Sequence, residues 1–281
     1  MSTLYLVATP IGNLGDFSPR ARETMASVDF IAAEDTRVTK KLLTALDLPT
    51  KPLISYYEHN RRQRGEEILA RLLAGESCAL VTDAGTPAVS DPGEDLVALC
   101  AEHGVPVIPV PGCCAAVCAL AASGLPTGRW CFEGFLSVNK KARREHLDAL
   151  RGETRTMIFY EAPHKLRQTL SDLRAAFGGD RRISLSREIT KLHEETLRFT
   201  LEEAEAYFGE TAPRGEFVLI LEGAAAEIES ETEDERMTRA LAAVQQRIDA
   251  GETLKDAVKT VSAEIGVKKN ALYQAALNAQ E

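Results

Sequence analysis

One loop in the first half of the chain carries residues suited to holding a ligand. At residues 81–93 the sequence reads VTDAGTPAVSDPG, directly after a buried apolar run. Its small residues let backbone amides and carbonyls approach a ligand closely. Asp83 and Asp91 can orient the loop through Asx-type hydrogen bonds or contact polar groups of the ligand. Because two Gly, two Pro and two Asp are more than a simple connection needs, we predict that this loop binds a ligand.

Two further loops have related features. ATPIGN at residues 8–13 follows the opening apolar run, where Pro10 fixes one backbone angle and Gly12 permits a turn of either hand. VPGCCAA at residues 110–116 enters a helix of small residues, whose free N-terminal amides suit an anion. An ordinary tight turn and tight core packing stay open as the respective alternatives. Neither loop matches a dinucleotide or Walker A fingerprint.

The cysteines do not indicate a metal site. Six cysteines lie between Cys78 and Cys131, but they form no Cys-x-x-Cys pair and have no histidine at a zinc-finger offset. We therefore expect free thiols in a reducing compartment and no bound metal.

The elements that position these loops alternate between strands and helices up to residue 125, which predicts a parallel α/β sheet. In such a sheet, ligands bind at the carboxyl ends of the strands, where all three loops begin. Strands are expected at residues 4–8, 28–33, 78–83 and 105–110, with a shorter one at 52–56, and helices near 18–27, 36–46, 62–74 and 93–103.

A break at residues 124–128, GLPTG, predicts a domain boundary, giving domains at 1–125 and 126–226. The second domain should also be α/β, with a mixed or antiparallel sheet, because its strands alternate more clearly. Its strands are expected at residues 130–135, 154–162, 181–188, 196–201 and 216–223, and a helix at 163–177.

The C-terminal part reads as an acidic linker and a helical tail at residues 236–281. Residues 227–235 carry six acids and no base, and helical periodicity follows at 236–250 and 253–279. A turn at Gly266 divides the last segment in the manner of a helix-turn-helix, whose second helix starts at Lys268 and Lys269. RNA binding and simple packing are equally open for this tail.

Composition places few limits on function. The 281 residues are 44% hydrophobic and 27% charged, typical of a globular protein, and no apolar run reaches membrane-spanning length. With no leader pattern at its start, the chain is expected to stay in the cytoplasm. The net charge of −9 opposes nucleic-acid binding, but the acidic and the basic residues are concentrated in different parts of the chain. Basic clusters occur at Arg61, Arg62 and Arg64 and at Lys140, Lys141, Arg143 and Arg144. An ordinary solvated surface is the alternative interpretation of either cluster.

Eight motifs, in their order and spacing, resemble those of the ribosomal RNA small subunit methyltransferase I proteins. That family belongs to the class III, tetrapyrrole-methylase-like methyltransferases. The resemblance runs from about residue 3 to the C-terminus and includes the terminal GVKKNALY segment. The motifs are TPIGN at 9–13, AAEDTR at 32–37, VTDAGTPAVSDPG at 81–93, PGCCAA at 111–116, FEGFL at 132–136, FYEAPH at 159–164, SREITK at 186–191 and GEFVLILEG at 215–223.

The resemblance implies two α/β domains with S-adenosylmethionine in the cleft between them, and a homodimer. It implies 2′-O-methylation of a cytidine ribose in small-subunit ribosomal RNA, with the RNA or the small ribosomal subunit as partner and no membrane or metal. Where relatives read Pro-Gly-Pro-Cys, this chain has Pro111-Gly112-Cys113-Cys114, which weakens the assignment of Cys114. By residue match the cofactor site is Pro10, Asp83, Ala84, Gly85, Thr86, Ala88, Val89, Cys114, Ala115, Tyr160, Val218 and Leu219.

Methyl transfer to a ribose hydroxyl needs in-line alignment and benefits from a base, because the hydroxyl is a weak acid. The charged residues that are candidates for this work could instead form structural salt bridges. Arg37, Arg187 and Lys191 could also contact RNA phosphates. The candidates for catalysis or positioning are Glu34, Asp35, Arg37, Glu161, Arg187 and Lys191, with Glu133, Glu188, His59 and His164 as further possibilities.

Two other functions compete with this interpretation. One is methylation of a tetrapyrrole or another small substrate, which needs neither basic clusters nor a helical tail. The other is a non-catalytic RNA-binding or ribosome assembly protein, whose RNA affinity would not depend on S-adenosylmethionine.

Overall fold

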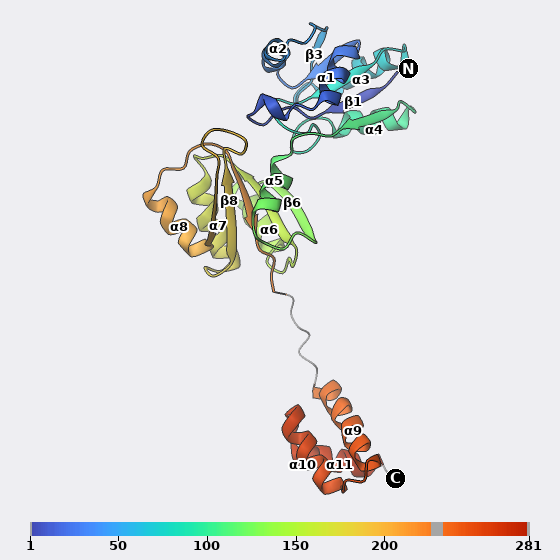
Figure 1. The fold of residues 1–281 in the computed structure, drawn as a ribbon, viewed down its shortest axis with the longest axis vertical. Helices are drawn as coiled ribbons and strands as arrows, with labels where there is room; N and C mark the ends of the chain where they lie inside the picture. The colour runs from blue at the N-terminus through green and yellow to red at the C-terminus, as the bar shows by residue number, and fades with distance from the viewer. Residues whose placement is uncertain (1, 226–232, 280–281) are drawn as a thin grey trace. The chain divides into compact units, whose positions relative to one another are not determined.

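The computed structural model describes residues 2–225 and 233–279. The chain separates into two compact units, Met1–Ala224 and Ala225–Glu281. The larger unit contains two β-sheets, each with its own helices, which we call the first and second lobes (Figure 1). The domain division at residue 125 stays a prediction, since the contacts within the larger unit do not divide it there.

The first lobe is the parallel α/β sheet that the sequence predicts. Its strand order is β3-β2-β4-β1-β5, and every neighbouring pair is parallel. Apolar side chains of α1 and α2 cover one face and those of α3 and α4 cover the other, which explains why β2 and β4 are buried throughout. The elements are β1 (Leu4–Val7), η1 (Leu14–Asp16), α1 (Pro19–Ser27), β2 (Phe30–Ala33), α2 (Thr36–Ala45), β3 (Leu53–Ser55), α3 (Arg61–Leu73), β4 (Cys78–Val81), α4 (Glu94–Glu102) and β5 (Val107–Val110).

The second lobe has a mixed sheet in the order β6-β7-β10-β8-β9, as expected. Only β6 and β7 pair in parallel, and the other neighbours are antiparallel. The elements are β6 (Trp130–Phe135), α6 (Lys140–Ala149), β7 (Thr156–Glu161), α7 (Leu166–Phe177), β8 (Arg182–Arg187), β9 (Glu195–Thr200), α8 (Leu201–Glu210) and β10 (Phe217–Leu221).

Two helices of this lobe, α6 and α8, were not predicted from the sequence. α6 contains the basic cluster at residues 140–144, which the sequence pattern indicates only as charged surface. α8 carries a recognisable start signal, because Thr200 and Glu203 form a reciprocal capping box at its N-terminus.

Helix α5 (Ala115–Ala122) connects the two lobes. It follows β5 of the first sheet, yet Ala119 and Leu120 pack against Val218 and Ile220 of the second sheet. Arg198 of β9 donates a hydrogen bond from Nε to the Ser123 carbonyl at 3.0 Å, at the carboxyl end of this helix. The start of α5 is thereby fixed between the two sheets, which positions the loop at residues 111–114.

The C-terminal unit is a bundle of α9 (Glu233–Asp249), α10 (Leu254–Ile265) and α11 (Lys269–Asn278). Val244, Val258 and Leu272 lie in its separate apolar core. The predicted turn is confirmed, since Gly266 ends α10 in the left-handed conformation. α9 begins at Glu233, so the last acids of the predicted linker are helical, and residues 227–232 of that linker lie outside the described residues.

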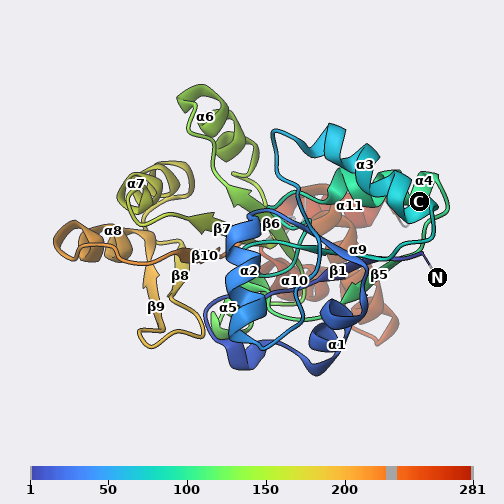
Figure 2. The ribbon, with the colours of Figure 1, turned by 90° about the horizontal axis from the view of Figure 1, so that it is seen from above.

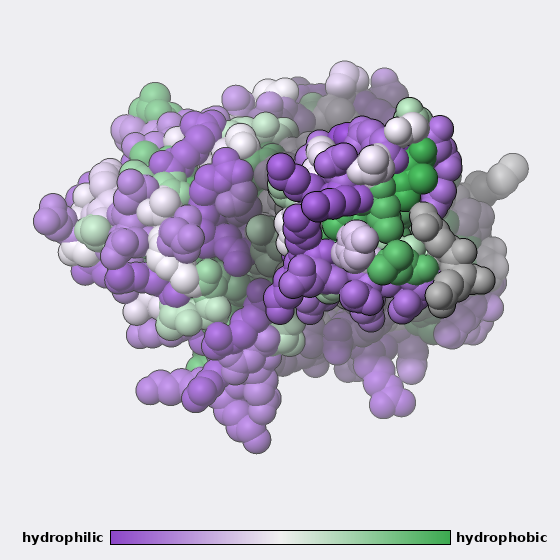
Figure 3. All heavy atoms as spheres, turned by 90° about the horizontal axis from the view of Figure 1, so that it is seen from below, coloured by the Kyte–Doolittle hydropathy of each residue, from purple (hydrophilic) through white to green (hydrophobic). Residues whose placement is uncertain are grey.

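The described helices are too short or too polar to cross a bilayer. The face seen in Figure 3 is mostly hydrophilic, with smaller groups of hydrophobic residues between the polar ones. Figure 2 shows the ribbon from above, with α3 and α4 lying together on the first lobe.

Candidate functional site

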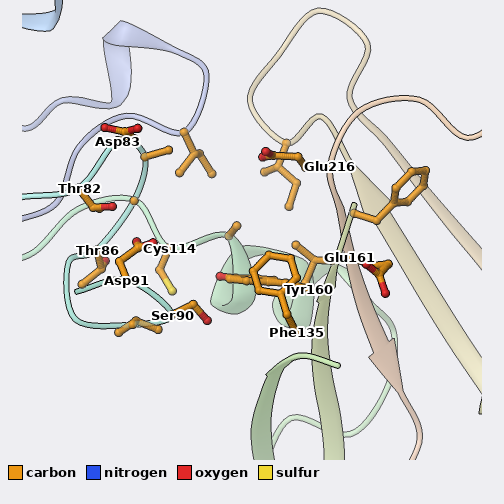
Figure 4. A pocket seen from close by; sticks show the side chains of 18 of the residues that line it. Thr82, Asp83, Thr86, Ser90, Asp91, Cys114, Phe135, Tyr160, Glu161 and Glu216 are labelled. Carbon is orange, nitrogen blue, oxygen red and sulfur yellow. The ribbon is translucent and has the colours of Figure 1, made fainter. Parts of the chain in front are cut away.

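A cavity of about 360 Å³ lies within the larger unit, with walls from both lobes (Figure 4). Its volume is within the range usual for small-molecule sites. The first lobe contributes the ends of β2 and β4 and the loops that follow, and the second contributes β7, β10 and the loop after β8. The lining residues are Ile11, Glu34, Thr82, Asp83, Ala84, Gly85, Thr86, Val89, Ser90, Asp91, Cys114, Ala115, Phe135, Tyr160, Glu161, Ala162, Glu188, Ile189, Lys191, Glu216, Phe217 and Val218.

The three loops singled out in the sequence are joined to one another by hydrogen bonds. The Thr9 amide donates to the Gly85 carbonyl at 2.8 Å, and the Gly85 amide donates back to Thr9 at 3.1 Å. The Thr86 hydroxyl donates to the Cys113 carbonyl at 2.9 Å. Gly112 allows the third loop to approach the first, because a Cβ there would lie 2.8 Å from the Ala8 Cβ. The loops therefore form one continuous wall.

The central part of this wall has an unusual backbone. Ala88 and Ser90 have positive φ angles of 66° and 65°, which side chains other than glycine rarely adopt. Gly93 has a φ of 152°, and a Cβ there would lie 2.9 Å from the Ala88 Cβ. Each such residue costs on the order of 1–3 kcal/mol, and such strain gathers at ligand sites. From this loop, Ala84, Gly85, Thr86, Val89 and Ser90 line the cavity.

Three carboxylates meet at the first-lobe side of the cavity. Glu34 accepts a hydrogen bond from the Thr82 hydroxyl at 2.6 Å, and Asp83 accepts one from the Asp35 amide at 3.2 Å. Burial, with the nearby charges of Glu34 and Asp83, raises the pKa of Asp91 to about 6. Burial and Glu34 also raise the pKa of Asp83.

Mutual repulsion among these groups is relieved by a cation, so this side of the cavity suits a positively charged ligand. The described residues offer no group of three or more His, Cys, Asp or Glu side chains arranged to hold a metal ion.

The opposite wall is aromatic. The Tyr160 hydroxyl oxygen accepts a hydrogen bond from the Ala116 amide at 3.2 Å, at the start of α5. Burial raises the pKa of Tyr160 to about 12, so the phenol stays neutral. Its ring packs edge-on against Phe132 and Phe135, with centroids 5.1 and 5.6 Å away. Cys114, the N-cap residue of α5, makes no side-chain capping bond within the described chain, which leaves this helix end suited to an anion.

Among the predicted catalytic residues, Glu34, Glu161 and Lys191 line the cavity, and so does Glu188 from the further possibilities. The Glu161 carboxylate nevertheless points to the other face of β7, because side chains alternate along a strand. It is 3% exposed, accepts the Thr169 hydroxyl, and accepts the Ala162 amide at 2.9 Å. This satisfied, buried carboxylate fits a structural role better than proton transfer.

Lys191 joins the lobes. Its ammonium lies 3.0 Å from the Glu188 carboxylate, and its chain passes so close to Gly12 that a Cβ there would lie 2.4 Å from the Lys191 Cγ. The loop after β8 thus rests on the first loop of the other lobe.

The other predicted catalytic residues lie outside the cavity lining. Asp35 accepts hydrogen bonds from the Arg37 guanidinium and amide, which lower the pKa of Asp35 to about 2. Arg187 donates to Glu195 at 2.7 Å, and Glu133 pairs with the His146 Nε2 at 2.8 Å. These contacts match the structural salt bridges that the sequence left open as the alternative. His59 and His164 are also absent from the lining.

Most residues predicted for the cofactor site line the cavity; Pro10, Ala88 and Leu219 do not. Leu219 faces the core beneath α7, on the opposite side of β10 from Val218. Because side chains alternate along a strand, the Leu219 side chain points away from the cavity. Sequence reasoning assigned no role to Phe135, although its place beside Gly134 at a strand end, within the FEGFL motif, was a usable signal. Asp91, which the sequence analysis named as a possible ligand contact, also lines the cavity. The remaining lining residues, which it assigned to neither role, are Ile11, Thr82, Ser90, Ala162, Ile189, Glu216 and Phe217.

Comparisons with known proteins agree on one family. Residues 3–205 match Tetrapyrrole (Corrin/Porphyrin) Methylases. The Ribosomal RNA small subunit methyltransferase I of Synechocystis sp. is 48% identical over 277 residues, covering 99% of this chain and 98% of the relative. Uroporphyrin-III-C-methyltransferase from Thermus thermophilus shares the fold, with a TM-score of 0.56 at 18% identity, over 78% of this chain and 94% of its own. A structure of Uroporphyrin-III C-methyl transferase from Thermus thermophilus complexed with S-adenyl homocysteine gives a TM-score of 0.51 at 20% identity, over 78% of this chain and 97% of its own.

Proposed function

Because the chain belongs to the ribosomal RNA small subunit methyltransferase I family, we propose that it methylates RNA of the small ribosomal subunit, using S-adenosylmethionine. The acceptor that we propose is the ribose 2′-oxygen of a cytidine, as the family resemblance implies. The observation that carries the proposal is a cavity between the lobes that combines a carboxylate cluster, the N-terminus of α5 and an aromatic wall.

The residues present fit S-adenosylmethionine group by group. Glu34, Asp83 and Asp91 suit its sulfonium and ammonium charges. The start of α5 at Ala115 suits its carboxylate. The apolar surface around Val218 suits its adenine. When bound, S-adenosylmethionine supplies an already activated methyl group.

The chain's own task is then to exclude water, align the acceptor hydroxyl and take its proton. Among the predicted catalytic groups, Glu34 has a carboxylate that faces the cavity. Its hydrogen bond from Thr82 fixes the carboxylate's orientation. We therefore propose Glu34 as the proton acceptor of first choice, with Lys191 positioning the RNA.

The same proposal includes the remaining expectations from the family. The protein acts as a homodimer and in the cytoplasm, where its ribosomal substrate is made.

The test is to incubate the purified protein with methyl-labelled S-adenosylmethionine and three separate acceptors. These are small ribosomal subunits lacking the modification, naked RNA from those subunits, and a tetrapyrrole such as uroporphyrinogen. Label in either RNA-containing acceptor supports the proposal.

Label only in the tetrapyrrole would favour the small-substrate function instead. RNA affinity without any methyl transfer, unaffected by S-adenosylmethionine, would indicate a binding protein rather than an enzyme.

A further inference from the structure

Phe135 is an exposed aromatic residue at the edge of the cavity. It ends strand β6, its ring is 58% exposed, and it also lines the cavity beside Tyr160 (Figure 4). Large apolar side chains at such positions are usually buried when they serve only packing. Three residues further on, Val138 is 80% exposed, a second exposed apolar side chain between the end of β6 and α6.

The next element, α6, starts with an unfavourable arrangement of charge. Its first five residues include four bases, and its first turn has no acid. A helix N-terminus carries partial positive charge, so cations there destabilise the helix. The acids of this helix, Glu145 and Asp148, come only in later turns. Arg143 is paired with Asp172 inside the fold, but the other three bases gain little from folding, whereas binding of a polyanion gives them a role.

The bases of α6 do not all face the same way. Arg143 points inward, with its side chain 12% exposed, and donates to Asp172 at 2.5 Å. Lys141 and Arg144 are 86% and 84% exposed, and their nearest acids lie 3.8 and 3.7 Å away, too far for good hydrogen bonds. With the exposed Lys140, they form a surface that we call the α6 basic surface: Lys140, Lys141 and Arg144.

The exposed ring and the first base of the α6 basic surface cannot lie far apart, because few residues separate them. Lys140 follows Phe135 by five positions, a reach of at most about 18 Å. A nucleotide whose ribose enters the cavity would have its base beside Phe135 and its flanking phosphates within reach of α6.

We propose that Phe135 is the stacking platform for the base of the nucleotide to be methylated, and that the α6 basic surface binds the flanking phosphates. This inference rests on the proposed function and specifies where the RNA lies. The partner is RNA rather than a second protein chain, because an exposed aromatic ring next to weakly paired cations is complementary to a base next to phosphates.

The test of the platform compares Phe135→Leu with Phe135→Tyr. Both retain an apolar body at an exposed position, but only Tyr retains a ring. Loss of stacking on one base should raise the KM for RNA in the Leu variant by about 5- to 100-fold. The Tyr variant should stay within about threefold of the unchanged protein. Trp130→Leu, at the opposite end of β6 and outside the cavity lining, is the matched control.

The Kd of S-adenosylmethionine, measured by calorimetry, separates the two possible occupants of the ring. It should be unchanged in Phe135→Leu. A weakened S-adenosylmethionine Kd with an unchanged KM for RNA would overturn the proposal and assign Phe135 to the cofactor. If neither the S-adenosylmethionine Kd nor the KM for RNA changed in Phe135→Leu, the proposal would be overturned as well.

The test of the basic surface is the salt dependence of RNA binding. Lys140→Gln with Lys141→Gln should weaken binding and lower the slope of log K against log salt by about 0.7 for each phosphate that the variant no longer neutralises. Arg20→Gln with Arg129→Gln, exposed bases on α1 and directly before β6 that belong to neither basic cluster, is the charge-matched control.

An unchanged slope, or a change in oligomeric state instead of RNA affinity, would refute the proposal. If the unaltered protein transfers no methyl group to RNA, the proposed function itself fails. That result is distinct from transfer that is insensitive to these substitutions.

Discussion

Asp91→Asn should remove a distinct pH dependence from the binding of S-adenosylmethionine. Asp91 lies in the cavity, and burial together with Glu34 and Asp83 raises its pKa to about 6 from an ordinary value of 3.8. A cationic ligand favours the ionised carboxylate. The affinity is therefore greatest above about pH 7 and falls as the pH drops through 6, because Asp91 then takes up a proton.

The size of the effect follows from that pKa. The ionised fraction of Asp91 is about nine-tenths at pH 7 and about one-tenth at pH 5. If only the ionised form contributes, the affinity falls about tenfold over this interval, or about 1.4 kcal/mol. Asp91→Asn should show the weaker affinity at both values, without this step.

The assay is isothermal titration calorimetry between about pH 5 and pH 8, with Asp95→Asn on α4 as the control. Asp95 has a half-exposed side chain paired with Arg61 and lies outside the cavity lining. Asp91→Asn should also be at least as stable as the unaltered protein at neutral pH, since a carboxyl whose pKa is raised by folding destabilises the folded state once it ionises. If the affinity of Asp91→Asn for S-adenosylmethionine still fell about tenfold between pH 7 and pH 5, Asp91 would not be the group whose protonation weakens binding.

Three further predictions concern the walls of the cavity. Gly93→Ala should lower both the free energy of unfolding and the S-adenosylmethionine affinity, because its Cβ would lie 2.9 Å from the Ala88 Cβ. The control is Gly75→Ala, which should affect only stability, because Gly75 has a positive φ but no neighbour within 4 Å. Tyr160→Phe should cost about 1 kcal/mol in urea unfolding, because the Ala116 amide loses its acceptor, and an unchanged midpoint would contradict this. Arg198→Gln removes a donor to the Ser123 carbonyl and should likewise lower the free energy of unfolding by about 1 kcal/mol; equal stability in denaturant titrations would count against a role for this hydrogen bond in holding α5.

The sequence predicted well where local pattern decides the structure. Buried strands such as Cys78–Val81 are short apolar runs bounded by turn residues, and their carboxyl-end loops could be recognised as binding loops from their glycine, proline and aspartate content. The turn at Gly266 was predictable because a glycine between two apolar stripes ends a helix in the left-handed conformation.

Prediction was weaker where pairing between distant residues decides the role. Nothing local distinguishes Glu34, whose carboxylate faces the cavity, from Asp35, which pairs with Arg37. Glu161 was a candidate base from its position at a strand end, but strand alternation places its carboxylate beneath α7 with Thr169. The packing of α5 on the second sheet is also a long-range effect, since it depends on contacts with Val218 and Ile220.

The most direct test of the central claim is to identify the methylated nucleoside. RNA from small ribosomal subunits treated with the protein and labelled S-adenosylmethionine is digested to nucleosides and analysed by mass spectrometry. The account predicts a single labelled product, 2′-O-methylcytidine, which also protects its 3′ phosphodiester bond from alkaline cleavage. Label on the base of a nucleoside, or RNA without label, would contradict it.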